Sequence, residues 1–260
     1  MPIGNILRFG IGSNRYSAKR LIKTLYFTLY GTPDLHTHIR WRIIKRFIDV
    51  HASLVLDVGC GIGLIALELA LKRRGMKIIG IDIDQEAIDR ANLLKEKLRI
   101  TNAEFHHCDV RTLPFHDQQF DMVLLIDVIE HVQNPEMILE NISRLLKPSG
   151  VVIVSVPTPN YPKFFGYEFH KEIGHVRDGY WHDEIIEMMD HYNIRVTVYQ
   201  YYTYYPSSLV CSVYYRFLRK SKLGIALSPV LNLVSYLDWI WPVRQGDFAC
   251  SLVVKGQKEK

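Results

Sequence analysis

The sequence predicts an α/β fold in which a mostly parallel sheet is covered by helices on both faces. Between residues 54 and 156, short apolar segments alternate with helix-like segments. A glycine-rich segment, Asp57-Val58-Gly59-Cys60-Gly61-Ile62-Gly63, joins the first apolar segment to the first helical one. Finally, each of the first four predicted strands ends in a carboxylate, namely Asp57, Asp82, Asp109 and Asp127.

Strands are predicted wherever the sequence is continuously apolar, because strands buried on both faces show no polar alternation. The first five strands cover residues 54–56, 77–83, 103–109, 121–127 and 151–156. Two further strands are expected in the last third of the chain, at residues 194–201 and 247–255.

Helices are predicted between these strands, at residues 64–70, 85–98, 135–146 and 183–190. Asp84 is placed to cap the second of them, and Pro135 opens the third. Pro148-Ser149-Gly150 is expected to end that third helix. Residues 157–181 are rich in Pro, Gly, His and aromatic side chains, which predicts a long functional loop.

The two ends of the chain form additions to this core. We divide the chain into an N-terminal helical extension (1–49), a core (50–205), an aromatic and basic insertion (206–246) and a last strand with a tail (247–260). Within the extension, residues 17–30 can form a helix that either covers the ligand crevice or rests on a membrane surface. The insertion either contacts a membrane or forms a lid over an apolar acceptor pocket.

Charge is segregated along the chain. The net charge of +5 is the balance of basic residues at both ends and acidic residues in the middle. Basic ends either meet an anionic membrane or nucleic acid, or simply solvate the surface. No RNA- or DNA-binding module is recognisable, which disfavours nucleic acid. The uncharged residues 223–237 are too few to span a bilayer, so any membrane association is expected to be peripheral.

The four cysteines, Cys60, Cys108, Cys211 and Cys250, show neither a paired metal-binding spacing nor a disulfide framework. A reducing, cytoplasmic location is therefore expected. The first residues do not begin an apolar signal core, so we expect no secretory leader.

The glycine-rich turn predicts a ligand site, because glycines let a ligand approach bare backbone and the next helix offers free N–H groups. A dinucleotide fold requires G-x-G-x-x-G, but position 64 is Leu. Taken alone, the turn is equally compatible with a purely structural role.

The carboxylates that end the strands extend this site, since ligands bind outside the carboxyl ends of strands in open α/β sheets. Asp82 can accept hydrogen bonds from both hydroxyls of a ribose, and Ile83 packs either on an adenine face or in the core. Asp109, followed by Val110, either accepts from the exocyclic amine of adenine or lies in a surface turn.

Several motifs then appear in order. The acid-x-G-x-G-x-G form resembles motif I of the class I S-adenosylmethionine-dependent methyltransferases. The region from Cys108 to Asp121, the Glu130-His131-Val132 segment and the Lys147-Pro148-Ser149-Gly150 turn resemble the broad group that includes the quinone-biosynthesis methyltransferases. Ser149 departs from the glycine usual in that turn. The resemblance covers residues 50–156 well, 157–200 loosely, and 1–49 and 206–246 poorly.

This resemblance implies a Rossmann-like class I methyltransferase sandwich, with a seven-stranded sheet and an antiparallel last strand. To this core we expect the chain to add the N-terminal helical extension and a helical insertion before the last strand. It implies S-adenosylmethionine as cofactor and methyl transfer by in-line displacement to a small or lipid-like acceptor. Oxygen is the first expectation for the attacked atom, with carbon or nitrogen left open. The expected cofactor-binding residues are Asp57, Gly59, Cys60, Gly61, Gly63, Asp82, Ile83, Asp109, Val110 and Asp127.

Two histidines are candidate bases. His131 follows the fourth strand and either acts in the acceptor site or pins the following helix. Gly174-His175, followed by Asp178, resembles the Thr-His-Asp segment of ubiquinone-pathway O-methyltransferases, which nominates His175 as a base or an orienting group. The spacing of Glu168, His170, Glu172 and His175 fits no standard zinc pattern, so no metal site is predicted.

Two other classes of function compete with this interpretation. A dinucleotide oxidoreductase is disfavoured by Leu at position 64 and by the later motifs. A protein that binds the cofactor without turnover is compatible with the same motifs. The sequence predicts neither the identity of the acceptor nor the oligomeric state.

Overall fold

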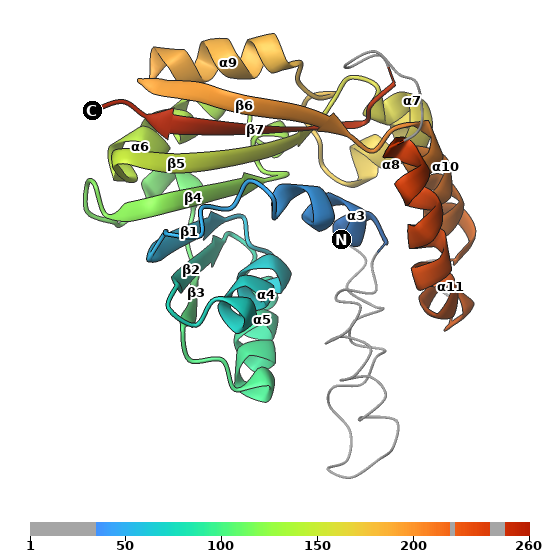
Figure 1. Ribbon diagram of the computed structural model, residues 1–260, viewed down its shortest axis with the longest axis horizontal. Coiled ribbons are helices and arrows are strands. Elements are labelled where there is room, and N and C mark those ends of the chain that lie inside the picture. The colour runs from blue at the N-terminus through green and yellow to red at the C-terminus, as the bar shows by residue number, and fades with distance from the viewer. Residues whose placement is uncertain (1–34, 219–221, 240–247) are drawn as a thin grey trace.

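The computed structural model describes residues 35–218, 222–239 and 248–260, so the helix expected at residues 17–30 lies outside the described residues. Within them, the sheet has seven strands in the order β3-β2-β1-β4-β5-β7-β6 (Figure 1). The strands are β1 (Leu54–Val58), β2 (Lys77–Asp82), β3 (Ala103–His107), β4 (Phe120–Ile126), β5 (Leu146–Pro157), β6 (Ile194–Tyr202) and β7 (Ser251–Lys258).

Strand pairing confirms the predicted fold class. Strand β1 pairs in parallel with β2 and β4, and the parallel pairing continues outward to β3 and β5. Strand β7 runs antiparallel to both of its neighbours, β5 and β6, as the resemblance implied. The chain first extends the sheet from β1 toward β3 and then resumes on the other side with β4. This reversal beside β1 is where ligands bind in such sheets.

Helices cover both faces of the sheet and bury its apolar side chains. Side chains of α3 (Leu35–Ile44), α4 (Leu64–Lys72) and α5 (Gln85–Leu98) pack on one face, and those of α6 (Pro135–Leu145) and α9 (His182–His191) pack on the other. The predicted cap is present: the Asp84 carboxylate accepts hydrogen bonds from the N–H groups of Glu86 and Ala87 at the start of α5.

Two local expectations were wrong. Residues 157–181 contain two short helices, α7 (Tyr161–Phe165) and α8 (Tyr167–Glu172), rather than one long loop. Pro162 is tolerated because it occupies the first turn of α7, and Gly166 separates the two helices with φ +93°. Residues 148–150, which were expected to form a turn, lie instead within β5. The pairing of β5 with β4 is irregular there, between the pairs Phe120–Leu146 and Met122–Val151.

The described part of the insertion is helical, as predicted. It contains α10 (Tyr205–Val213), the π-helix η3 (Tyr214–Leu218), α11 (Lys222–Val234) and the 3₁₀ helix η4 (Ser235–Trp239). Helices α10 and α11 lie side by side at one end of the sheet (Figure 1). Leu35 and Ile39 of α3 pack on Val210 and Tyr214, so the extension and the insertion share a small core. Among the described residues, none of the helices combines the length and apolar character needed to cross a bilayer.

Candidate functional site

A cavity of about 740 Å³ opens at the carboxyl ends of β1, β2 and β4. Its size is in the range of pockets that hold small molecules and cofactors. Eight of the twelve residues singled out from the sequence line this cavity, whereas Asp57, Cys60, Gly63 and His175 do not. The eight are Gly59, Gly61, Asp82, Ile83, Asp109, Val110, Asp127 and His131.

The glycine-rich turn presents bare backbone to this cavity. Gly59 and Gly61 have φ angles of +67° and +53°, which favour glycine strongly. A Cβ added at Gly59 would lie 2.6 Å from the Val128 side chain, so the turn also has no room for one. Gly63 serves packing instead, because its Cβ would collide with Phe105 at 2.6 Å.

Asp82 joins the end of β2 to the glycine-rich turn. Its Oδ2 accepts a hydrogen bond from the N–H of Gly61 at 2.7 Å, and its Oδ1 accepts one from the N–H of Asp84 at 2.9 Å. The carboxylate is therefore fixed at the cavity wall. The next residue, Ile83, is 63% exposed, which excludes core packing as its role and leaves its side chain available to a ligand.

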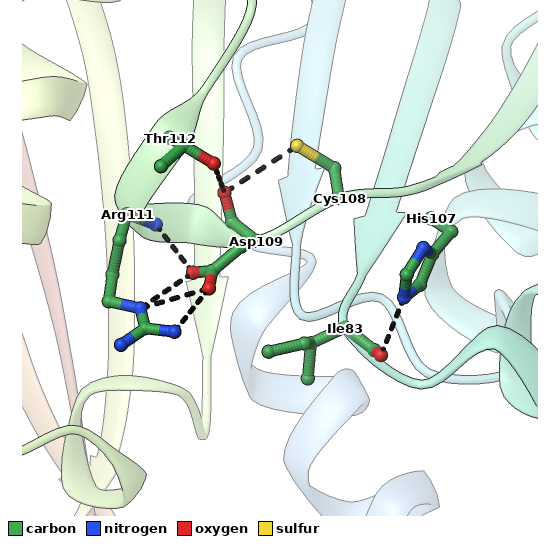
Figure 2. A network of polar contacts seen from close by, with 6 residues as sticks. All are labelled: Ile83, His107, Cys108, Asp109, Arg111 and Thr112. Carbon is green, nitrogen blue, oxygen red and sulfur yellow. Dashed lines mark hydrogen bonds and ion pairs between the residues drawn. The ribbon is translucent and has the colours of Figure 1, made fainter.

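Asp109 is engaged by a neighbour that the sequence analysis did not consider. Its carboxylate accepts hydrogen bonds from the N–H of Arg111 at 2.9 Å and from Arg111 Nε at 2.9 and 3.0 Å (Figure 2). The Arg111 guanidinium holds the pKa of this carboxyl below its usual range. Arg111 itself lines the cavity, so any contact between Asp109 and a ligand must share the carboxylate with it.

Figure 2 also shows how the end of β3 is tied to the loop after β2. His107 Nε2 lies 3.0 Å from the carbonyl oxygen of Ile83. This contact fixes the backbone that carries Ile83 and leaves its side chain exposed.

Asp57 is buried and electrostatically costly. Only 3% of the residue is exposed, and burial, with a further contribution from the Asp82 charge, raises its pKa to about 7. The N–H of Ala66 donates to its carboxylate, but Oδ2 has no hydrogen-bond partner in the part of the chain that the structure describes. A buried carboxylate with an unpaired oxygen is unfavourable unless a ligand or a proton satisfies it.

Asp127 follows β4 and is held by a residue of the N-terminal extension. Its backbone has a φ of +53°, and its carboxylate forms an ion pair with Arg40 of α3. Arg40 is 5% exposed, so helix α3 contributes a buried cation that pairs with a carboxylate at the wall of the cavity. Sequence reasoning missed Arg40, because nothing in the spacing of residues 1–49 relates them to Asp127.

The two candidate bases meet. The rings of His131 and His175 are 4.7 Å apart between centroids, in an edge-to-face arrangement. His131 Nδ1 lies 3.1 Å from the carbonyl oxygen of Gly174, and His175 Nε2 lies 4.0 Å from Glu130 Oε1. Glu130 is fully buried, and its burial raises its pKa to about 8.

Glu130, His131 and His175 each offer one atom for metal ligation, and these atoms lie within 4.8 Å of one another. Two imidazoles and a carboxylate form a donor set that divalent transition metals accept. The spacing in the sequence predicts no metal site, because it relates His175 only to its neighbours in the chain. The three-residue cluster joins the end of β4 to the segment after α8, a contact that the spacing does not reveal.

Comparison with known proteins places this geometry in a family. Residues 50–187, more than half of the chain, match the model of a methyltransferase domain. The ubiquinone biosynthesis O-methyltransferase of Coxiella burnetii (strain Dugway 5J108-111) is 31% identical over 126 residues, which are 48% of this chain and 53% of that protein. The enzyme of the same name from Azoarcus sp. (strain BH72) is 34% identical over 128 residues, 45% of this chain and 52% of that protein.

The chain thus spans about half the length of the curated relatives that it matches. Among solved structures, phosphoethanolamine N-methyltransferase 2 of Haemonchus contortus, in complex with S-adenosyl-L-methionine, superposes with a TM-score of 0.61. Its sequence identity is 21%, and the match covers 84% of this chain and 52% of that one, which supports the fold alone. With its matched domain, its seven-stranded sheet and its glycine-lined cavity, the chain belongs to the family of class I S-adenosylmethionine-dependent methyltransferases.

Proposed function

We propose that this chain transfers a methyl group from S-adenosylmethionine to an oxygen atom of a small or lipid-like acceptor. The observation that carries the proposal is that the expected cofactor residues and the two candidate bases lie close together. The wall that holds the glycine-rich turn and Asp82 also holds His131, which contacts His175 beside the buried Glu130. The relatives that the chain matches over about half of their length are named O-methyltransferases, which favours the same atom.

The residues at the cavity fit the cofactor. The backbone of Gly59 and Gly61 would hold its amino-acid end, Asp82 its ribose hydroxyls, and the exposed Ile83 its adenine ring. The unpaired oxygen of Asp57 lies at the base of the same turn and would complement the cofactor's ammonium group, directly or through water. When bound, S-adenosylmethionine supplies a methyl group already activated by the positive charge on sulfur.

The protein must then orient the acceptor and receive its proton. A hydroxyl is a weak nucleophile, so its proton has to be removed as the methyl group is transferred. When His131 Nδ1 donates to the Gly174 carbonyl, Nε2 is the nitrogen that can accept a proton. We therefore assign proton acceptance to the pair formed by His131 and His175, with Glu130 beside it.

The proposal is tested by incubating the protein with methyl-labelled S-adenosylmethionine and an extract of phenolic and isoprenoid lipids. Label should enter an extractable product, and mass spectrometry should place it on oxygen. His131→Gln and His175→Gln should each lower the single-turnover rate about 100-fold, while binding of S-adenosylhomocysteine stays within about threefold. His116→Gln, at an exposed position, is the matched control and should leave the rate unchanged.

Each alternative has its own outcome. Label on nitrogen or carbon would overturn the oxygen assignment but not methyl transfer. Tight binding of S-adenosylhomocysteine without transfer to any acceptor would identify a non-catalytic binding protein. Quenching of protein fluorescence by NADH, but not by S-adenosylhomocysteine, would favour an oxidoreductase.

We also propose that the insertion associates peripherally with a membrane. The alternative role for the insertion is a lid over a lipid-like acceptor. Exposed apolar side chains on α10 and α11, such as Leu209 and Leu233, support this proposal. The basic residues of the same segment support it as well.

A further inference from the structure

The turn that carries His131 is bonded to the segment that carries His175. The turn is the 3₁₀ helix η2 (Ile129–His131), which follows β4. The segment, residues 174–180, follows α8, and we call it the strap. Each of the three residues of η2 makes one polar contact with the strap, so the relative position of the two candidate bases depends on these contacts.

Two of the contacts join η2 to the backbone of the strap. The N–H of Val176 donates to the carbonyl oxygen of Glu130 at 3.0 Å, and the carbonyl oxygen of Gly174 lies 3.1 Å from His131 Nδ1. A 3₁₀ helix of three residues has few hydrogen bonds of its own, so contacts from outside fix its orientation. The contact with Gly174 also decides which ring nitrogen of His131 is left to accept a proton.

Tyr180 makes the third contact through its side chain. Its hydroxyl donates to the carbonyl oxygen of Ile129 at 3.2 Å, and the residue is 1% exposed. The Arg177 guanidinium carbon lies 4.3 Å from the centroid of the Tyr180 ring and holds it from the other side of the strap. Burial raises the pKa of Tyr180 to about 12, so the hydroxyl stays protonated and remains a donor at neutral pH.

The backbone at Tyr180 is packed against the end of β5. The N–H of Tyr180 donates to the carbonyl oxygen of Pro157 at 3.0 Å. The preceding residue, Gly179, has a φ of +140°, and a Cβ there would lie 2.5 Å from the same carbonyl oxygen. The strap therefore leaves the sheet at a fixed point, and the Tyr180 hydroxyl ties η2 to that point.

We propose that Tyr180 is a positioning residue for methyl transfer, which keeps His131 and His175 in the arrangement that receives the acceptor's proton. This inference rests on the proposed function, because it requires that the two histidines take part in the reaction. Tyr180 does not line the cofactor cavity, so it acts through η2 and the strap. A displacement of about 1 Å in an active site can lower a rate about 100-fold, so a small shift of η2 is sufficient.

The test replaces Tyr180 by Phe, which removes the hydroxyl and keeps the buried ring. The wild type and Tyr180→Phe are incubated with methyl-labelled S-adenosylmethionine and serial dilutions of the extract of phenolic and isoprenoid lipids. The maximal single-turnover rate should fall about tenfold or more. The dilution that gives half of the maximal rate and the dissociation constant of S-adenosylhomocysteine should both stay within about threefold, because only the proton-accepting arrangement is disturbed.

Tyr201→Phe is the matched control. Tyr201 is 5% exposed and belongs to the same hydrophobic cluster as Tyr180, but its hydroxyl lies 3.0 Å from His182 Nδ1. The substitution makes the same chemical change at a buried tyrosine that does not contact η2, and it should leave the rate unchanged. Equal loss of rate in the two variants would show a general effect on stability and would overturn the proposal.

Amide hydrogen exchange gives a readout that does not depend on turnover. In Tyr180→Phe, the N–H of Val176 should exchange about tenfold faster or more, because the strap separates from η2 more readily. In Tyr201→Phe it should exchange as in the wild type. A wild-type rate or unchanged exchange in Tyr180→Phe would refute the positioning role and leave the proposed function intact. If the wild type itself transfers no label, the proposed function is wrong, and the role of Tyr180 fails with it.

Discussion

At the scale of single residues, two carboxylates near the glycine-rich turn have opposite surroundings. Asp82 accepts two backbone N–H groups at the cavity wall, and these stabilise its charge. Asp57 is buried with one unpaired oxygen, and burial raises its pKa to about 7. Asp82 is therefore suited to bind a polar ligand, whereas Asp57 makes the stability of the protein depend on pH.

Asp82→Ala should weaken binding of S-adenosylhomocysteine by roughly 10- to 100-fold, because hydrogen bonds to a charged group contribute about 1.5–3 kcal/mol. Isothermal titration calorimetry measures the change. Asp89→Ala removes the same charge from an exposed position on α5 and should bind normally. An unchanged dissociation constant for Asp82→Ala would remove the ribose contact from the proposed site.

Asp57→Asn should flatten the dependence of stability on pH. The native pKa of about 7 lies above the ordinary value of 3.8, so the folded state binds more protons between these values. Wild-type stability should therefore fall as pH rises from about 4 through about 7 and then level off. Urea unfolding of both proteins between these limits tests the difference. If the stability of both proteins depended on pH in the same way, Asp57 would not have a raised pKa in the folded state.

At the scale of elements, the sequence predicted what local patterns determine. Continuous apolar runs located the strands of the sheet, and Asp84 located the start of α5. Helices α7 and α8 were not foreseen, since their segment is rich in Pro and Gly and too short to show periodicity. Helix α3 lies within the predicted helical extension, but its bounds were not foreseen, because its polar and apolar residues are buried alike and show no separate polar face.

Asp84→Ala should lower the free energy of unfolding by about 1 kcal/mol, because the N–H groups of Glu86 and Ala87 lose their acceptor. Asp84→Asn keeps an acceptor oxygen and should cost only a fraction of that amount. Urea denaturation compares both with the wild type. Equal losses in the two variants would mean that the charge of Asp84, rather than the cap, provides the stability.

Arg40→Ala should loosen α3, since the ion pair with Asp127 ties this helix to the end of β4. Amide hydrogen exchange should accelerate across Leu35–Ile44 and leave α9, on the opposite face, unchanged. Arg46→Gln, near the end of the same helix, is the comparison variant. Uniform acceleration over the whole chain would indicate global destabilisation instead of local release.

At the scale of the whole molecule, the cavity was predictable, whereas the buried contacts behind its wall were not. The glycine-rich turn and Asp82 are close in sequence to the strands that carry them, so spacing alone indicated one crevice. Arg40, by contrast, reaches Asp127 across 87 positions, and His175 reaches Glu130 only through the fold of the segment after β5. Contacts of this kind depend on tertiary packing, which one sequence does not encode in any local pattern.

The composition and exposure of the insertion support the proposed association with an anionic membrane. Tyr205, Leu209, Phe217 and Leu233 are between 45% and 71% exposed, and residues 205–237 contain four Lys or Arg and no Asp or Glu. Apolar side chains with basic neighbours bind anionic lipid surfaces in the plane of the interface.

The double substitution of Leu209 and Leu233 by Asp should therefore reduce sedimentation with phosphatidylglycerol vesicles about tenfold or more, because it removes apolar area and adds like charge to the lipid surface. The matched control replaces Leu71 and Leu93, which are 45% and 43% exposed on α4 and α5, by Asp. Added salt should weaken wild-type binding, since basic residues contribute to it. If the control loses as much binding as the test variant, net charge alone governs the association, and the proposed membrane contact of the insertion is wrong.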